Sequence, residues 1–125
     1  ALQHAVEPVA KRERVQEFAA ESELRSEQRR VLNAFFEGPR LKSIPAQRGK
    51  KEIVLEELLR RLPRKREYQE KELSLWLKAI HEDYCLLRRE FLAGGYMTRE
   101  EHVFRLTEKG RRAAGRAGRV REGDD

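Results

Sequence analysis

The apolar residues of this chain fall into short runs with helical spacing, and a glycine or a proline closes several of these runs. The clearest run lies between residues 54 and 62 and must end at Pro63. Its inward side carries Val54, Leu55, Leu58, Leu59 and Leu62. Only 38% of the residues are hydrophobic and 40% are charged, so these runs have to supply the core. The expected fold class is therefore mainly α, one compact domain with polar arms.

The same spacing predicts helices on both sides of this run. We expect them over residues 8–21, 23–37, 70–80 and 83–92, with a last one from residue 108. Gly38-Pro39 should end the helix over 23–37, and Asp83 is a good N-cap for the helix over 83–92. Because a proline disfavours helix at the residue before it, residues 41–44 before Pro45 should form a loop or a short strand.

After Gly94-Gly95 the hydrophobic period changes from helical to alternating. Residues 96–99 and 103–106 read as two short strands joined by residues 100–102, and Tyr68 as a short extended piece. From residue 52 the order is helix, extended piece, helix, helix, hairpin. That order is typical of a winged helix-turn-helix, with three helices plus a short β-hairpin as the wing.

The remaining sequence divides into arms around this domain. We expect a linker or helical arm over residues 1–22, a packing or dimerisation helix over 23–41, the winged-helix-like domain over 42–110, and a disordered Arg/Gly-rich tail over 111–125. The helix over 23–41 has an apolar face that a homodimer could bury. Its residues are Leu24, Val31, Leu32, Phe35 and Phe36.

The net charge of +6 is unevenly distributed. Residues 42–66 hold nine basic side chains against three acidic ones, whereas residues 67–107 hold six against eight. A basic segment therefore precedes a slightly acidic helix-turn-helix. Such a segment suits an anionic partner, duplex DNA above all. An alternative is a general preference for arginine, which supplies twenty of the 28 basic residues.

Eight basic side chains are the candidate DNA contacts. Four of them surround a helix start whose N–H groups favour phosphate: Lys42, Arg48, Lys50 and Lys51. Arg88 and Arg89 on the second helix would approach the major groove. Arg99 and Arg105 on the wing would reach the flanking DNA backbone. The alternatives are a solubilising loop or an acidic protein partner for the first four. For Arg88 and Arg89 the alternative is pairing with acidic neighbours on a solvated helix.

Metal and catalytic sites are not expected. His81, Asp83 and Cys85 alternate along the chain, and a helix would place neighbours of that spacing on different sides. Cys85 is more simply a buried packing residue. No glycine-rich phosphate loop or nucleophile motif is present, so we expect no enzyme and no cofactor. The longest apolar stretches are too short to span a membrane, so a cytoplasmic protein is expected.

Two stretches resemble known families. Residues 103–111 are similar to the end of the wing and the start of the next helix in winged-helix regulators of the multidrug-resistance and phenolic-acid repressor types. Four segments together resemble the bacterial domain of unknown function twenty eighty-seven over residues 27–106. They are Leu41–Arg48 followed by Lys50-Lys51, Tyr68–Glu72, His81–Tyr84 and Leu87–Glu90.

That domain is often carried behind an arsenical-repressor-type DNA-binding domain in transcriptional regulators. The resemblance therefore implies a bacterial regulator, and makes the segment before Leu24 a linker from such an upstream domain. We expect a winged-helix regulator that binds duplex DNA. The alternative is a protein-interaction or dimerisation module of a larger regulator that does not read DNA itself.

Overall fold

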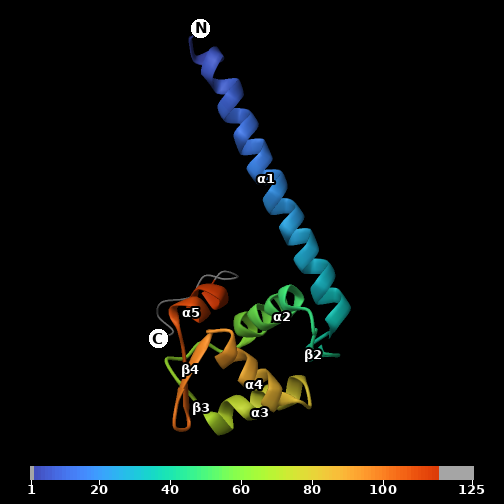
Figure 1. The fold of residues 1–125 in the computed structure, drawn as a ribbon, viewed down its shortest axis with the longest axis vertical. Coiled ribbons are helices and arrows are strands. Elements are labelled where there is room, and N and C mark those ends of the chain that lie inside the picture. Colours follow the sequence, from blue (N-terminus) through green and yellow to red (C-terminus); the bar gives the residue numbers. More distant parts are fainter. Residues whose placement is uncertain (1, 116–125) are drawn as a thin grey trace.

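The computed structural model describes residues 2–115, and their side chains from residue 19 onward. A long helix, α1, leads into a small body, and its N-terminal part points away from that body (Figure 1). The elements in chain order are α1 (Leu2–Phe35), β1 (Phe36–Glu37), β2 (Arg40–Leu41), α2 (Arg48–Arg61), β3 (Tyr68–Gln69), α3 (Glu70–Ile80), α4 (Tyr84–Ala93), β4 (Met97–Glu100), β5 (Val103–Leu106) and α5 (Glu108–Gly115).

The body has the winged helix-turn-helix arrangement expected from the sequence. Helices α2, α3 and α4 are followed by the antiparallel β4–β5 hairpin, and the short strand β3 pairs with β5 to give the sheet order β3-β5-β4. The backbone N–H of Glu70 donates to the carbonyl of His102 at 2.8 Å, which attaches the start of α3 to the tip of the hairpin. The mainly α fold class and its wing are thus confirmed.

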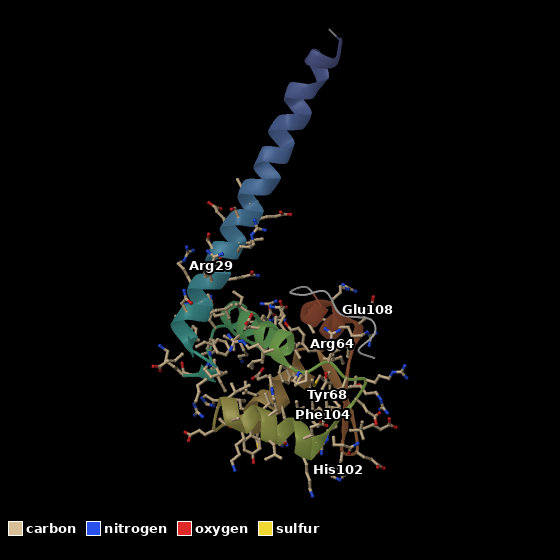
Figure 2. The ribbon with its side chains drawn as sticks, turned by 180° about the vertical axis from the view of Figure 1, so that it is seen from behind. Arg29, Arg64, Tyr68, His102, Phe104 and Glu108 are labelled. Atoms are coloured by element: carbon tan, nitrogen blue, oxygen red, sulfur yellow. The ribbon has the colours of Figure 1, made fainter. Side chains whose placement is uncertain are left out.

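The core lies where α2, α3, α4 and the sheet meet. Leu58, Leu73, Leu77, Leu87 and Phe91 are fully buried. Tyr68 and Phe104 face each other across the β3–β5 pair and point into the body, as Figure 2 shows. Burying a side chain of this size stabilises the fold by about 1.5–3 kcal/mol. The stripes predicted on residues 54–62, 70–80 and 83–92 therefore supply the core, although Trp76 and Tyr84 are only half-buried.

Capping explains why α3 and α4 begin where they do. A capping box at Gln69 and Glu72 starts α3, and the Asp83 carboxylate accepts the N–H of Leu86 at 3.4 Å to start α4. The hairpin turns at Glu101, whose φ of 58° lies in the left-handed region. The N-cap predicted at Asp83 is confirmed.

The N-terminal region differs from the sequence-based expectation. Residues 8–21 and 23–37 were expected to form two helices, but α1 is continuous and ends at Phe35. Gly38, with a φ of 61°, makes a tight turn, so Phe36-Glu37 pairs with Arg40-Leu41 as a second hairpin. The hairpin forms for a local reason: the turn at Gly38 reverses the chain, so that the N–H of Lys42 can donate to the carbonyl of Phe35 at 2.7 Å.

The face expected to form a dimer is largely used inside the chain. Val31 and Phe36 are buried in the core, and Leu32 and Phe35 are half-buried and pack against it. Only Leu24 is strongly exposed, at 59%. The packing role predicted for this helix therefore accounts for four of the five side chains without a second copy.

The C-terminal helix α5 begins where expected and overlaps the start of the predicted tail. Thr107 caps α5 by accepting the N–H of Gly110 at 3.1 Å, as predicted. The helix continues to Gly115, past the boundary at residue 111 where a disordered tail was expected, because Ala113 and Ala114 are buried against the body. The rest of that predicted tail, residues 116–125, lies outside the described residues.

Within residues 2–115 no helix combines the length and the apolar character that a membrane crossing needs.

Candidate nucleic-acid interface

Helix α3 presents a stripe of exposed side chains on the side opposite its core residues. Lys71, Leu75 and Lys78 follow one another at helical spacing, and Leu75 is 70% exposed. On α4 the corresponding exposed side carries Cys85 and, one turn later, Arg89. We call these five residues the α3–α4 face. None of its three cations has an ion-pair partner among the described residues.

A hollow of about 360 Å³ runs between the two helices on this face. It is lined by Glu70, Lys71, Ser74, Leu75, Lys78, Tyr84, Cys85 and Arg88. The lining combines three basic side chains and one carboxylate with the apolar Leu75, and its positive charge suits the phosphates of a nucleic acid.

Arg88, expected to approach the major groove, is instead tied into the protein. Its guanidinium donates to Glu70 Oε2 at 3.4 Å, to the hydroxyl of Ser74 and to the Cys85 sulfur at 3.6 Å. Only 21% of its side chain is exposed. Arg88 therefore links α4 to α3, and Arg89 is the arginine that α4 leaves exposed.

The two wing arginines lie on opposite faces of the sheet. Arg99 stacks on the ring of Phe104, on the side of the helices, and pairs with Glu70 at 3.0 Å. Arg105 pairs with Glu67 at 2.8 Å, and its neighbour across the strands is Thr98 rather than Arg99. The structure brings Arg99 close to α3 and α4 and does not bring Arg105 there.

The basic segment before the domain lies beside the helix-turn-helix. Lys42 shares a surface hollow with His81 and Glu82 at the turn between α3 and α4. Lys51 reaches α4 directly, where its ammonium binds Glu90 at 3.1 Å. Lys42 and Lys50 are exposed without an ion pair within residues 19–115, whereas Arg48 makes only an exposed pair with Glu52, a kind that contributes little.

Helix α2 begins at Arg48, inside the basic segment for which anion binding was predicted. Gln47 is the N-cap of α2 but makes no capping bond from its side chain. The first backbone N–H groups of α2 therefore stay available next to Lys50.

Three glutamates of the helix-turn-helix have basic partners, whereas Glu82 and Asp83 at its turn are exposed and make no ion pair within residues 19–115. Glu70 binds Arg88 and Arg99, Glu72 binds Lys65, and Glu90 binds Lys51. The formal charge of residues 67–107 therefore gives a poor picture of the surface, because these carboxylates are neutralised locally while the cations of the α3–α4 face are not.

The carboxyl groups of Glu70 and Glu72 both have lowered pKa values. The hydrogen bond with His102 holds the pKa of Glu70 below its ordinary 4.5, and Arg99 and Arg88 lower it further. The hydrogen bond with Lys65 does the same for the pKa of Glu72. Both side chains are therefore ionised at neutral pH and act as fixed negative partners.

His81, Asp83 and Cys85 do not converge. The His81 ring nitrogen Nδ1 accepts the backbone N–H of Asp83 at 2.9 Å, and the Asp83 carboxylate caps α4. Cys85 is exposed, so the expectation of a buried packing cysteine was wrong. It occupies the outer side of α4 because Leu87 and Phe91 take the inner side.

A family model matches residues 40–106, that of the family described as "Uncharacterized protein conserved in bacteria (DUF2087)". The match covers more than half of the chain. The chain belongs to this family. In this DUF2087 chain the matched segment runs from β2 to the end of β5, so it contains the helix-turn-helix, the wing and the start of α2. Comparison with curated proteins and with solved structures finds no significant match.

Two cations of the DUF2087 domain were missed by reasoning from the sequence. Lys71 and Lys78 were not singled out because the segment around them is net acidic. The signal was nevertheless present in the helical spacing. Lys71 lies three residues before Ser74, and Lys78 lies seven residues after Lys71, so both fall on the side opposite Leu73, Leu77 and Ile80.

Proposed function

We propose that this bacterial DUF2087 protein binds duplex DNA through the α3–α4 face and acts as a transcriptional regulator. The observation that carries the proposal is the coincidence of fold and charge. The second helix of a helix-turn-helix is the element that enters the major groove in this architecture. Here that helix has an exposed, unpaired arginine, and its neighbour α3 adds two exposed lysines.

Each cation has a distinct role in this proposal. Arg89, near the middle of α4, is suited to the two acceptors of a guanine edge. Lys71 and Lys78 lie on α3 at the border of the hollow and would hold backbone phosphates. Lys42 and Lys50 extend the positive surface beyond the turn and the start of α2.

Salt-dependent binding of a labelled duplex of mixed sequence tests the proposal. Each phosphate contact contributes about 0.9 to the slope of log affinity against log salt. The variant K71Q/K78Q should therefore lower the slope by about 2. The variant R29Q/R30Q changes the net charge equally on α1, where Arg29 lies away from α3 and α4 (Figure 2), and should keep the slope of the unmodified protein.

Two results would contradict the proposal. One is an unmodified protein that shows no salt-dependent retention of duplex DNA. The other is an equal loss of binding in K71Q/K78Q and R29Q/R30Q, because that would reflect net charge alone.

A second candidate is a homodimer formed through α1. Most of the stability of a helix in a protein comes from packing of its apolar face against another element. Residues 19–27 of α1 are almost all exposed, including the apolar Leu24. Sedimentation equilibrium tests this, and a monomer whose circular dichroism shows α1 fully helical would remove the need for a second copy.

A further inference from the structure

Three side chains from three different elements converge on the carboxylate of Glu70. Arg88 on α4 lies 3.4 Å from Oε2, and Arg99 on β4 lies 3.0 Å from Oε1. His102, in the hairpin turn, has its Nδ1 atom 3.3 Å from Oε1. Glu70 thus joins the start of α3 to the helix α4 and to the wing.

The carboxylate is about as buried as Arg88, whose side chain is 21% exposed, and it lies deeper than Arg99. The side chain of Glu70 is 24% exposed, whereas that of Arg99 is 44% exposed. Figure 2 shows His102 at the tip of the hairpin, at the outer edge of the body. The two guanidinium groups carry one more positive charge than Glu70 neutralises, and their other hydrogen bonds go to uncharged groups, namely Ser74 and Cys85 for Arg88 and the carbonyl of Glu101, at 2.8 Å, for Arg99.

The cluster around Glu70 lies at the surface proposed to meet DNA. Glu70 lines the hollow of the α3–α4 face together with Arg88 and Lys71. An approaching phosphate would meet a fixed negative charge there, and it would have to compete with that charge for Arg88 and Arg99.

We propose that Glu70 is an internal counter-ion that holds Arg88 and Arg99 back from the DNA backbone. It thereby lowers the affinity of the α3–α4 face for DNA of any sequence. This inference rests on the proposed function. Because weaker phosphate binding leaves a larger share of the affinity to base contacts, Glu70 raises the preference for specific sites.

The chain offers a matched control in the Glu67–Arg105 pair. It also joins a glutamate to an arginine of the wing, at 2.8 Å, but Arg105 lies on the other face of the sheet from Arg99. E67Q and E70Q change the net charge equally, and each removes one carboxylate from an arginine partner. Only E70Q does so at the α3–α4 face.

The experiment measures binding to a labelled duplex of mixed sequence over a range of salt concentrations. E70Q should bind about threefold to tenfold more tightly near physiological salt, and its salt slope should be steeper by about 1–2. E67Q should bind within about twofold of the unmodified protein, with the same slope. E70A removes the charge with the residue of highest helix propensity, so it should give the same result as E70Q if the glutamine variant does not fold.

A mutant cycle then tests whether Arg99 is released. R99Q should reduce DNA affinity more in the E70Q background than in the unmodified protein, because only there does Arg99 reach a phosphate. Equal losses in the two backgrounds would overturn the inference, as would an E70Q affinity equal to that of E67Q. If the unmodified protein binds no DNA at all, the proposed function fails as well, so the two failures are distinguishable.

Discussion

Gly110 is the position at which a single methyl group should be most damaging. It is buried in α5, where α5 crosses the residue that precedes β4. A Cβ atom at this position would lie 2.1 Å from the carbonyl oxygen of Tyr96 and 3.1 Å from Leu106 Cδ2. The same Tyr96 oxygen accepts the backbone N–H of Thr107 at 2.9 Å, so it cannot move away without weakening that bond.

The magnitude for G110A follows from three contributions. Forcing a group into a packed site costs about 1–3 kcal/mol. Weakening the hydrogen bond to Tyr96 costs about 1 kcal/mol, and the better helix propensity of alanine offsets about as much. We therefore expect the free energy of unfolding to fall by about 1–3 kcal/mol.

Urea denaturation followed by circular dichroism measures this, with G49A as the matched control. Gly49 is also helical, but the nearest atom to an added Cβ is Gln47 Oε1 at 4.0 Å. G49A should leave stability unchanged or raise it by up to about 1 kcal/mol. A G110A protein as stable as G49A would refute the packing of α5 against Tyr96.

Two further predictions concern pH. Because the folded pKa values of Glu70 and Glu72 lie below the ordinary 4.5, their contribution to stability is complete above that pH and is lost as the pH falls through the lower, folded values. The urea midpoint should therefore drop in acid, and an E70Q/E72Q protein with the same drop would contradict this. At the alkaline end, burial raises the pKa of Tyr68 above 10.0, so stability should fall as the pH rises beyond that value. Y68F should remove this alkaline loss and cost about 1–3 kcal/mol at neutral pH, because the Tyr68 hydroxyl donates to the Pro63 carbonyl at 2.8 Å and accepts the Lys65 N–H at 3.0 Å. An alkaline transition unchanged in Y68F would show that another group is responsible.

The body of the fold could be predicted because its signals are local. The helix over residues 70–80 was expected with the bounds that α3 has, since its apolar side chains recur at helical spacing. The β1–β2 hairpin could not be predicted in the same way. Its strands have two residues each, too few to show an alternating pattern, and its turn depends on the conformation of Gly38.

The candidate site was only partly predictable because charge pairing depends on the tertiary fold. Arg89 could be identified from its position on the second helix. The pairing of Glu70 with Arg88 and His102 could not, because these partners lie 18 and 32 residues further along the chain. Counting charges along a segment treats all of them as exposed. The count therefore hid the unpaired lysines on α3 and overestimated how available Arg88 and Arg99 are to DNA.

The hairpin between α1 and α2 has a mechanical consequence. Arg61 of α2 stacks on Phe36 at 4.3 Å, and Arg40 donates to the carbonyl of Ala79 near the end of α3 at 3.2 Å. These contacts hold the junction between α1 and α2 in one orientation. The base of α1 is therefore fixed against α2 and against the C-terminal end of α3, the first helix of the helix-turn-helix.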